Sequence, residues 1–133
     1  MHNIYLDENL SPFVADALNS LSKGDFSDIK VNSTISDFGR GIKDETLIPK
    51  IGEKKAILIT RDINMNRVRL QSELLKIHKL GVFFIDLPKG KCKHWDIVLL
   101  LINNWQDIVQ VIRTKHTPYV CIIKPRGGVK FLK

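Results

Sequence analysis

The sequence predicts a single α/β domain in which helices form a layer on each side of a mainly parallel β-sheet. Short apolar runs alternate with longer segments of helical periodicity, which is typical of parallel strands joined by crossover helices. The 133 residues suffice for one hydrophobic core and contain no repeat or linker that would divide them. A Gly-Gly pair between the last two apolar runs predicts a C-terminal β-hairpin.

The first half of the chain is expected to contain three strands and two helices. Ser11 followed by Pro12 predicts a helix start, because the hydroxyl can cap a free N–H and proline fits the first turn. The run 56–59, Ala-Ile-Leu-Ile, has no polar residue and predicts a strand buried on both faces. Residues 32–43, with two glycines, predict a loop. The expected strands are 3–6, 29–31 and 56–59, and the expected helices are 12–24 and 44–55.

The second half is expected to contain a basic amphipathic helix at 67–79 and a long helix at 94–115. Strands are expected at 82–85, 119–124 and 129–132. Apolar residues at helical spacing are predicted to turn toward the core in both the first and the long helix. These residues are Phe13, Val14, Ala17, Leu18 and Leu21, and then Trp95, Val98, Leu99, Ile102, Trp105, Ile108, Val109 and Ile112.

The chain is basic, with a formal net charge of +7 and a pI of about 9.5. Long-range attraction then favours a polyanionic partner, of which RNA or DNA is the obvious class. A soluble basic protein without such a partner would have the same charge, so charge alone does not decide. Cys92 and Cys121 have no metal-ligand spacing, and no leader or membrane-length apolar run is evident, so a cytoplasmic location is expected.

Acidic residues follow several of the predicted strands. Asp7 and Asp86 come directly after an apolar run, Asp62 follows the run 56–59 after two further residues, and Asp44 opens the helix that leads into the 56–59 strand. Ligands collect at the carboxyl ends of parallel strands, where these side chains would converge. For Asp44 alone, capping of the helix N-terminus is the better explanation.

A cluster of carboxylates normally requires a divalent cation, because the negative charges repel one another. Oxygen ligands without paired Cys or His favour Mg²⁺ or Mn²⁺ over zinc. Such a metal can activate water and neutralise charge on a phosphodiester, so a basic protein with an acidic pocket suits a nuclease.

Three motifs resemble those of PIN domains. Leu6-Asp7-Glu8-Asn9 looks like their opening Asp-x-Asn. The segments 43–48, Lys-Asp-Glu-Thr-Leu-Ile, and 57–62, Ile-Leu-Ile-Thr-Arg-Asp, are similar to their Asp-x-x-Ile and Leu-x-Thr-x-Asp signatures. The likeness covers roughly residues 3–86 and is strongest to the compact PIN-like branch that includes relatives of VapC-type toxins.

The resemblance implies a metal-dependent endoribonuclease that leaves a 3′-hydroxyl. By this likeness Asp7, Asp44 and Asp62 would be catalytic and would bind Mg²⁺ or Mn²⁺, and Glu45, like Asp37, could supply a further carboxylate. Asn64 stands where many relatives have another acid. The resemblance also implies a toxin restrained by an antitoxin protein, and apolar surface on the 94–115 helix could serve a homodimer.

Basic residues near these acids are candidates for RNA binding. Arg61, Arg67 and Arg69 follow the central strand and Arg40 precedes Asp44, although a solvated helix face would look the same. Two other functions stay open. One is a PIN-like module that only binds RNA or protein. The other is a receiver-like domain phosphorylated on Asp62, which leaves Asp44 and the hairpin unexplained.

Overall fold

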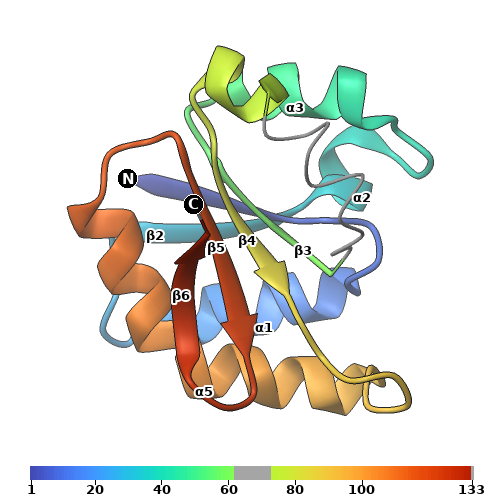
Figure 1. The fold of residues 1–133 in the computed structure, drawn as a ribbon, viewed down its shortest axis with the longest axis vertical. Coiled ribbons are helices and arrows are strands. Elements are labelled where there is room, and N and C mark those ends of the chain that lie inside the picture. The colour runs from blue at the N-terminus through green and yellow to red at the C-terminus, as the bar shows by residue number, and fades with distance from the viewer. Residues whose placement is uncertain (62–72, 133) are drawn as a thin grey trace.

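A computed structural model of the chain describes residues 1–61 and 73–132 (Figure 1). One six-stranded sheet has the order β2-β1-β3-β4-β5-β6. Neighbouring strands are parallel from β2 to β5, and β6 runs antiparallel to β5. The strands are β1 His2–Leu6, β2 Ile29–Ser33, β3 Ile57–Thr60, β4 Gly81–Ile85, β5 Tyr119–Lys124 and β6 Gly128–Leu132. The predicted α/β class and the C-terminal hairpin are confirmed.

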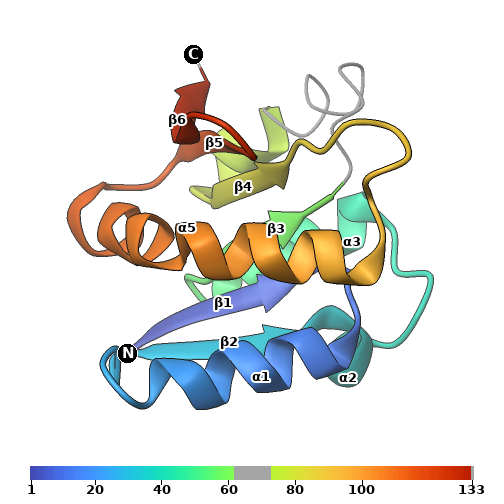
Figure 2. The same cartoon turned by 90° about the horizontal axis from the view of Figure 1, so that it is seen from below.

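Helices cover both faces of this sheet. The helices α1 Pro12–Ser22 and α5 His94–Thr114 lie side by side on one face, and α3 Asp44–Glu53 lies on the other (Figure 2). A short helix, α2 Thr34–Phe38, follows β2, and residues 73–78 are also helical. None of the helices in the described ranges has the length and apolar character needed to cross a membrane.

The central strand β3 belongs to both hydrophobic cores. Ile57 and Ile59 pack in the core beneath α1 and α5, while Leu58 packs in the core beneath α3. All four residues of the strand are buried, as its uninterrupted apolar run predicts. Because side chains alternate along a strand, Thr60 lies on the same side as Leu58, toward α3.

Two local predictions have clear outcomes. Ser11 caps α1, since its Oγ accepts a hydrogen bond from the Phe13 N–H at 3.1 Å. The loop predicted at 32–43 is wrong in its first part, because β2 continues to Ser33 and α2 follows at once. Thr34 is fully buried there, so tertiary packing outweighs the polar composition that predicted a loop. Of the helix expected at 67–79, only residues 73–79 lie within the described part, and residues 73–78 of these are helical.

More apolar residues of α1 and α5 were predicted to face the core than the structure buries there. Trp105 is 7% exposed, as expected, but Trp95 is 69% exposed. Several other residues assigned to the core are also exposed, namely Phe13, Ala17, Leu21, Leu99 and Ile102. The sheet covers only one strip of each helix, so apolar residues on the flanks remain at the surface, where several line a groove of about 240 Å³ between α1 and α5.

Candidate active site

The candidate site lies at the carboxyl ends of β1 and β3, which are neighbours in the sheet. Asp7 directly follows β1, and its backbone N–H donates to the Ile59 carbonyl at 3.0 Å, which continues the pairing with β3. Its side chain is on the same side as Tyr5, toward α3, by the alternation of the strand. Asp7 is only 7% exposed, so its side chain is largely buried at this edge of the sheet.

Both carboxylate oxygens of Asp7 accept hydrogen bonds. The Glu8 backbone N–H donates to Oδ1 at 2.8 Å, and the Thr60 hydroxyl donates to Oδ2 at 2.8 Å. Thr60 is 1% exposed, so this contact between β1 and β3 is shielded from water. The two bonds fix the orientation of the carboxylate, and each oxygen keeps a further lone-pair direction.

The two residues after Asp7 connect this edge to other segments. The Gly41 N–H donates to Glu8 Oε2 at 2.9 Å, which brings the segment before α3 against the segment after β1. The Arg61 N–H approaches Asn9 Oδ1 at 3.5 Å. Asp44, the first residue of α3, follows Gly41 by three residues in the chain.

The predicted acidic residues have different surroundings. Asp44 is half-buried at the N-terminus of α3, where the helix dipole stabilises negative charge, and Glu45 beside it is exposed. Asp37 accepts a hydrogen bond from the Tyr5 hydroxyl at 2.6 Å. Burial, followed by this carboxylate, raises the pKa of Tyr5. Asp37 thus has a structural partner on the α3 side of the sheet.

The predicted RNA-binding residues are only partly described. Arg40 is exposed before α3. Arg61 is exposed, and its Nη1 donates to the Cys92 carbonyl at 3.4 Å, in the loop between β4 and α5. Several predicted residues, Asp62, Asn64, Arg67 and Arg69, lie outside the described residues.

Asp86 directly follows the neighbouring strand, β4. Its backbone N–H donates to the Ile123 carbonyl at 3.0 Å, and Lys124 Nζ lies 3.9 Å from its Oδ2. The carboxylate of Asp86 therefore faces a cation from β5. It lies one strand farther along the sheet than Thr60.

A scan against models of known protein families matches the family described as PIN like domain over residues 2–87, more than half of the chain. The chain belongs to the PIN-like domain family. No curated protein and no solved structure gives a match. The matched range contains Asp7, Asp44 and Thr60, whereas α5 and the β5–β6 hairpin follow it.

PIN-like domains are generally divalent-metal-dependent nucleases and commonly bind RNA. The donor chemistry of the predicted site fits Mg²⁺ or Mn²⁺, because Asp7, Glu8, Asn9 and Asp44 all offer side-chain oxygen ligands. Within residues 1–61 and 73–132, no three His, Cys, Asp or Glu side chains are grouped closely enough to hold a metal. The third expected ligand, Asp62, lies outside those ranges.

Sequence reasoning did not foresee the role of Thr60 or the contact of Glu8 with Gly41. Thr60 ends an apolar strand, and its side chain lies on the same side of the sheet as that of Asp7. The two side chains meet only because β3 pairs with β1. This contact follows from the order of the strands in the sheet, and the sequence does not state that order directly.

Proposed function

We propose that this PIN-like domain is an endoribonuclease that uses Mg²⁺ or Mn²⁺ held by Asp7, Asp44 and Asp62, with Glu45 as a further catalytic carboxylate. The observation that carries the proposal is the Asp7 carboxylate, fixed by Thr60 and the Glu8 N–H at the carboxyl edge of a parallel sheet. This edge is where α/β folds bind ligands. The bound metal would supply an activated water and neutralise charge on the phosphate.

The protein's own residues would prepare the site before substrate arrives. Thr60 and the Glu8 N–H prevent rotation of the Asp7 carboxylate, so its remaining lone pairs keep one direction. The N-terminus of α3 offsets the repulsion between Asp44 and its acidic neighbours. Arg40 and Arg61, both exposed, would attract the RNA backbone to this acidic edge, and Arg67 and Arg69 are proposed to extend that attraction.

The test is cleavage of a panel of labelled RNAs by the purified protein with Mg²⁺ or Mn²⁺. Asp7→Asn keeps the shape of the side chain and an acceptor for Thr60 but removes the charge, so we expect cleavage to be lost while the protein stays folded. Asp62→Asn should act in the same way. Asp16→Asn is the matched control, because Asp16 is exposed on α1, and it should cut normally.

The second candidate function is a PIN-like module that binds RNA without cutting it. It is favoured by Asn64, a neutral residue at the position where many relatives have another acid. A wild-type protein that leaves the RNA panel intact in Mn²⁺ but still binds it would reject the nuclease and support this module.

We also propose, from the resemblance to VapC-type relatives, that the nuclease is a toxin controlled by an antitoxin protein. Expression of the wild-type chain should then arrest growth and degrade cellular RNA, whereas Asp7→Asn should do neither. Growth arrest that persists with Asp7→Asn would contradict a toxic nuclease.

A homodimer through the exposed apolar side of α5 is a further proposal, which sedimentation of the purified protein tests directly.

A further inference from the structure

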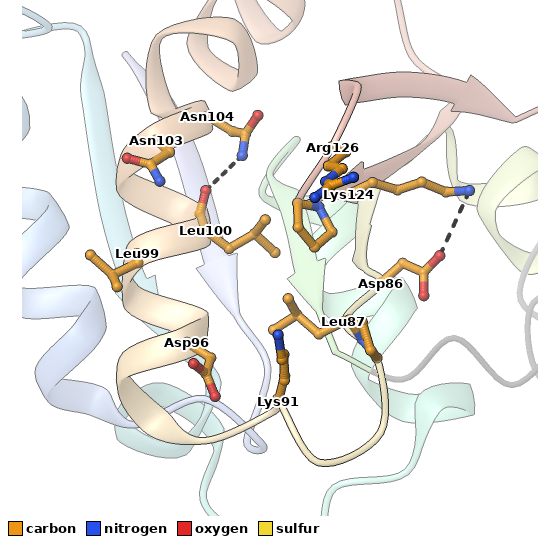
Figure 3. A pocket seen from close by; sticks show the side chains of 12 residues that line it. Asp86, Leu87, Lys91, Asp96, Leu99, Leu100, Asn103, Asn104, Lys124 and Arg126 are labelled. Atoms are coloured by element: carbon orange, nitrogen blue, oxygen red, sulfur yellow. Dashed lines mark hydrogen bonds and ion pairs between the residues drawn. The ribbon is translucent and has the colours of Figure 1, made fainter.

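A second hollow lies at the same sheet edge, beyond the candidate active site. It is a groove of about 590 Å³ between the first half of α5, the loop after β4 and the β5–β6 turn (Figure 3). Each of these elements contributes an apolar side chain: Leu100, Leu87 and Pro125 respectively. The volume is within the usual range for small-ligand pockets, roughly 300–1,000 Å³. An apolar surface of this kind can accept the face of a nucleobase.

Three cations surround the apolar part. Lys91 comes from the loop after β4, Lys124 from the end of β5 and Arg126 from the turn, and all three are exposed. Figure 3 shows Lys91 rising toward Leu87 from the loop below, with Arg126 above it at the turn. A guanidinium at this position can bind phosphate oxygens or stack on a base.

Two carboxylates also line the groove, but each already has a partner. Asp86 lies 3.9 Å from Lys124 Nζ. Asp96 Oδ2 accepts the Lys93 N–H at 3.1 Å, at the N-terminus of α5. In the described ranges, no acidic side chain forms an ion pair with Lys91 or Arg126. These two cations are therefore available to an anion.

Two amides complete the lining. Asn104 is 8% exposed, and its Nδ2 donates to the Leu100 carbonyl at 2.8 Å, which fixes the side chain. Asn103, the preceding residue of α5, is exposed and also lines the groove. Asn side chains offer a donor and an acceptor together, which matches the edge of a base.

The groove is close to the proposed site of cleavage. It starts where β4 ends, and β4 is the neighbour of β3, which carries Thr60. The hydrogen bond from Arg61 to the Cys92 carbonyl joins the end of β3 to the loop that forms one wall. Adjacent strands are about 4.8 Å apart, so the ends of β3 and β5 are only about 10 Å from each other.

We propose that this groove binds one nucleotide of the RNA, next to the phosphodiester that is cut. The base lies on the apolar surface of Leu87, Leu100 and Pro125, and the phosphate lies between Lys91 and Arg126. The choice of RNA rests on the proposed function. The site itself is built mainly from residues after position 87, where the match to the PIN-like family ends.

The experiment measures binding without cleavage. Fluorescence anisotropy of a labelled single-stranded RNA is recorded with full-length Asp7→Asn protein in EDTA. In this background, the pair Lys91→Glu and Arg126→Glu is compared with the pair Lys30→Glu and Lys54→Glu. Lys30 on β2 and Lys54 after α3 are exposed and do not line the groove, and the control pair changes the net charge equally. We expect the groove pair to raise Kd at least about tenfold more than the control pair does.

A crosslinking measurement locates the contact. RNA containing 4-thiouridine should crosslink, under ultraviolet light, to peptides from the loop after β4 and from the β5–β6 turn. Equal losses of affinity in the two pairs, or crosslinks only to other peptides, would overturn the proposal. A free mononucleotide that binds the groove while RNA affinity is unchanged in the groove pair would also overturn it.

Binding in EDTA separates this inference from the nuclease proposal. If the wild-type background cuts RNA and the groove pair binds and cuts it equally well, the nucleotide site is rejected and the nuclease stands. If binding depends on the groove but no RNA is cut with Mn²⁺, the nuclease is rejected and the nucleotide site stands.

Discussion

The hydrogen bond from Thr60 to Asp7 is the residue-scale feature on which the proposed chemistry depends. Thr60→Val keeps the shape of the side chain but removes the donor, so the Asp7 carboxylate can rotate. We expect RNA cleavage to fall about 10- to 100-fold, as when a group that orients a metal ligand is removed. The loss should appear in kcat more than in KM, because Thr60 is buried and would act on RNA cleavage only through Asp7.

Thr60→Ser is the control, since it restores a hydroxyl at the same position. Recovery of most of the cleavage rate in Thr60→Ser would support a positioning role. A rate in Thr60→Val equal to that of the wild type would contradict it. Cleavage that stays low in Thr60→Ser would show that packing of the methyl group matters instead.

A second residue-scale contact joins α1 to α5. The Trp105 indole N–H donates to the Ser22 hydroxyl at 2.9 Å, and both side chains are buried. Ser22→Ala leaves this N–H without its acceptor, so we expect a loss of about 1–3 kcal/mol in the free energy of unfolding. Urea denaturation measures it, with Ser20→Ala on the exposed side of α1 as the matched control. Equal stability of the two variants would contradict a stabilising role for the hydrogen bond from Trp105 to Ser22.

At the scale of elements, an ion pair connects the last turn of α5 to the turn before β2. Arg113 Nε donates to Asp28 Oδ2 at 2.9 Å, and Arg113 Nη2 donates to Asp28 Oδ1. Chiefly through these hydrogen bonds, Arg113 lowers the pKa of Asp28 from 3.8 to about 2. The unfolded chain then binds more protons than the folded one between these values, so stability from this pair rises with pH across that window.

We therefore expect Asp28→Asn to lower the Tm at pH values above 4, and the difference from wild type to shrink as the pH falls toward 2. Thermal unfolding followed by circular dichroism at several pH values measures this difference. Asp16→Asn should show no such trend, because Asp16 is exposed on α1. A difference for Asp28→Asn that is constant with pH would contradict the role of the ion pair.

The elements themselves were largely predictable, because their signals are local. The apolar run at 56–59 and the Ser11-Pro12 pair each act within a few residues, and both predictions are confirmed. The exposure of Trp95 was not predictable in this way, since it depends on how much of α5 the sheet and α1 cover. For the same reason α2 was not predicted, because burial of Thr34 outweighs the polar local composition that indicated a loop.

At the scale of the whole molecule, the sequence predicts that several acidic residues follow strands, but it does not predict which side chains meet at the sheet edge. Asp7 and Thr60 are 53 residues apart in the chain and meet because β1 and β3 are neighbours. The groove at Lys91 and Arg126 depends on the path of the β5–β6 hairpin beside α5. Such contacts follow from strand order, which no single motif contains.

The net charge of +7 predicts that RNA binding weakens as the salt concentration rises. The proposed groove predicts that Lys91 and Arg126 cause part of this salt dependence. For single-stranded nucleic acid, each phosphate contact contributes about −0.7 to the slope of log K against log salt. Because Lys91 and Arg126 contact one phosphate, Lys91→Glu with Arg126→Glu should reduce the magnitude of the slope by about 0.7, measured by anisotropy between about 50 and 200 mM salt. Lys30→Glu with Lys54→Glu changes the net charge equally and should leave the slope nearly unchanged. If both pairs reduce the slope alike, RNA is attracted by the charge of the whole molecule, and the basic residues at the sheet edge have no special part in binding it.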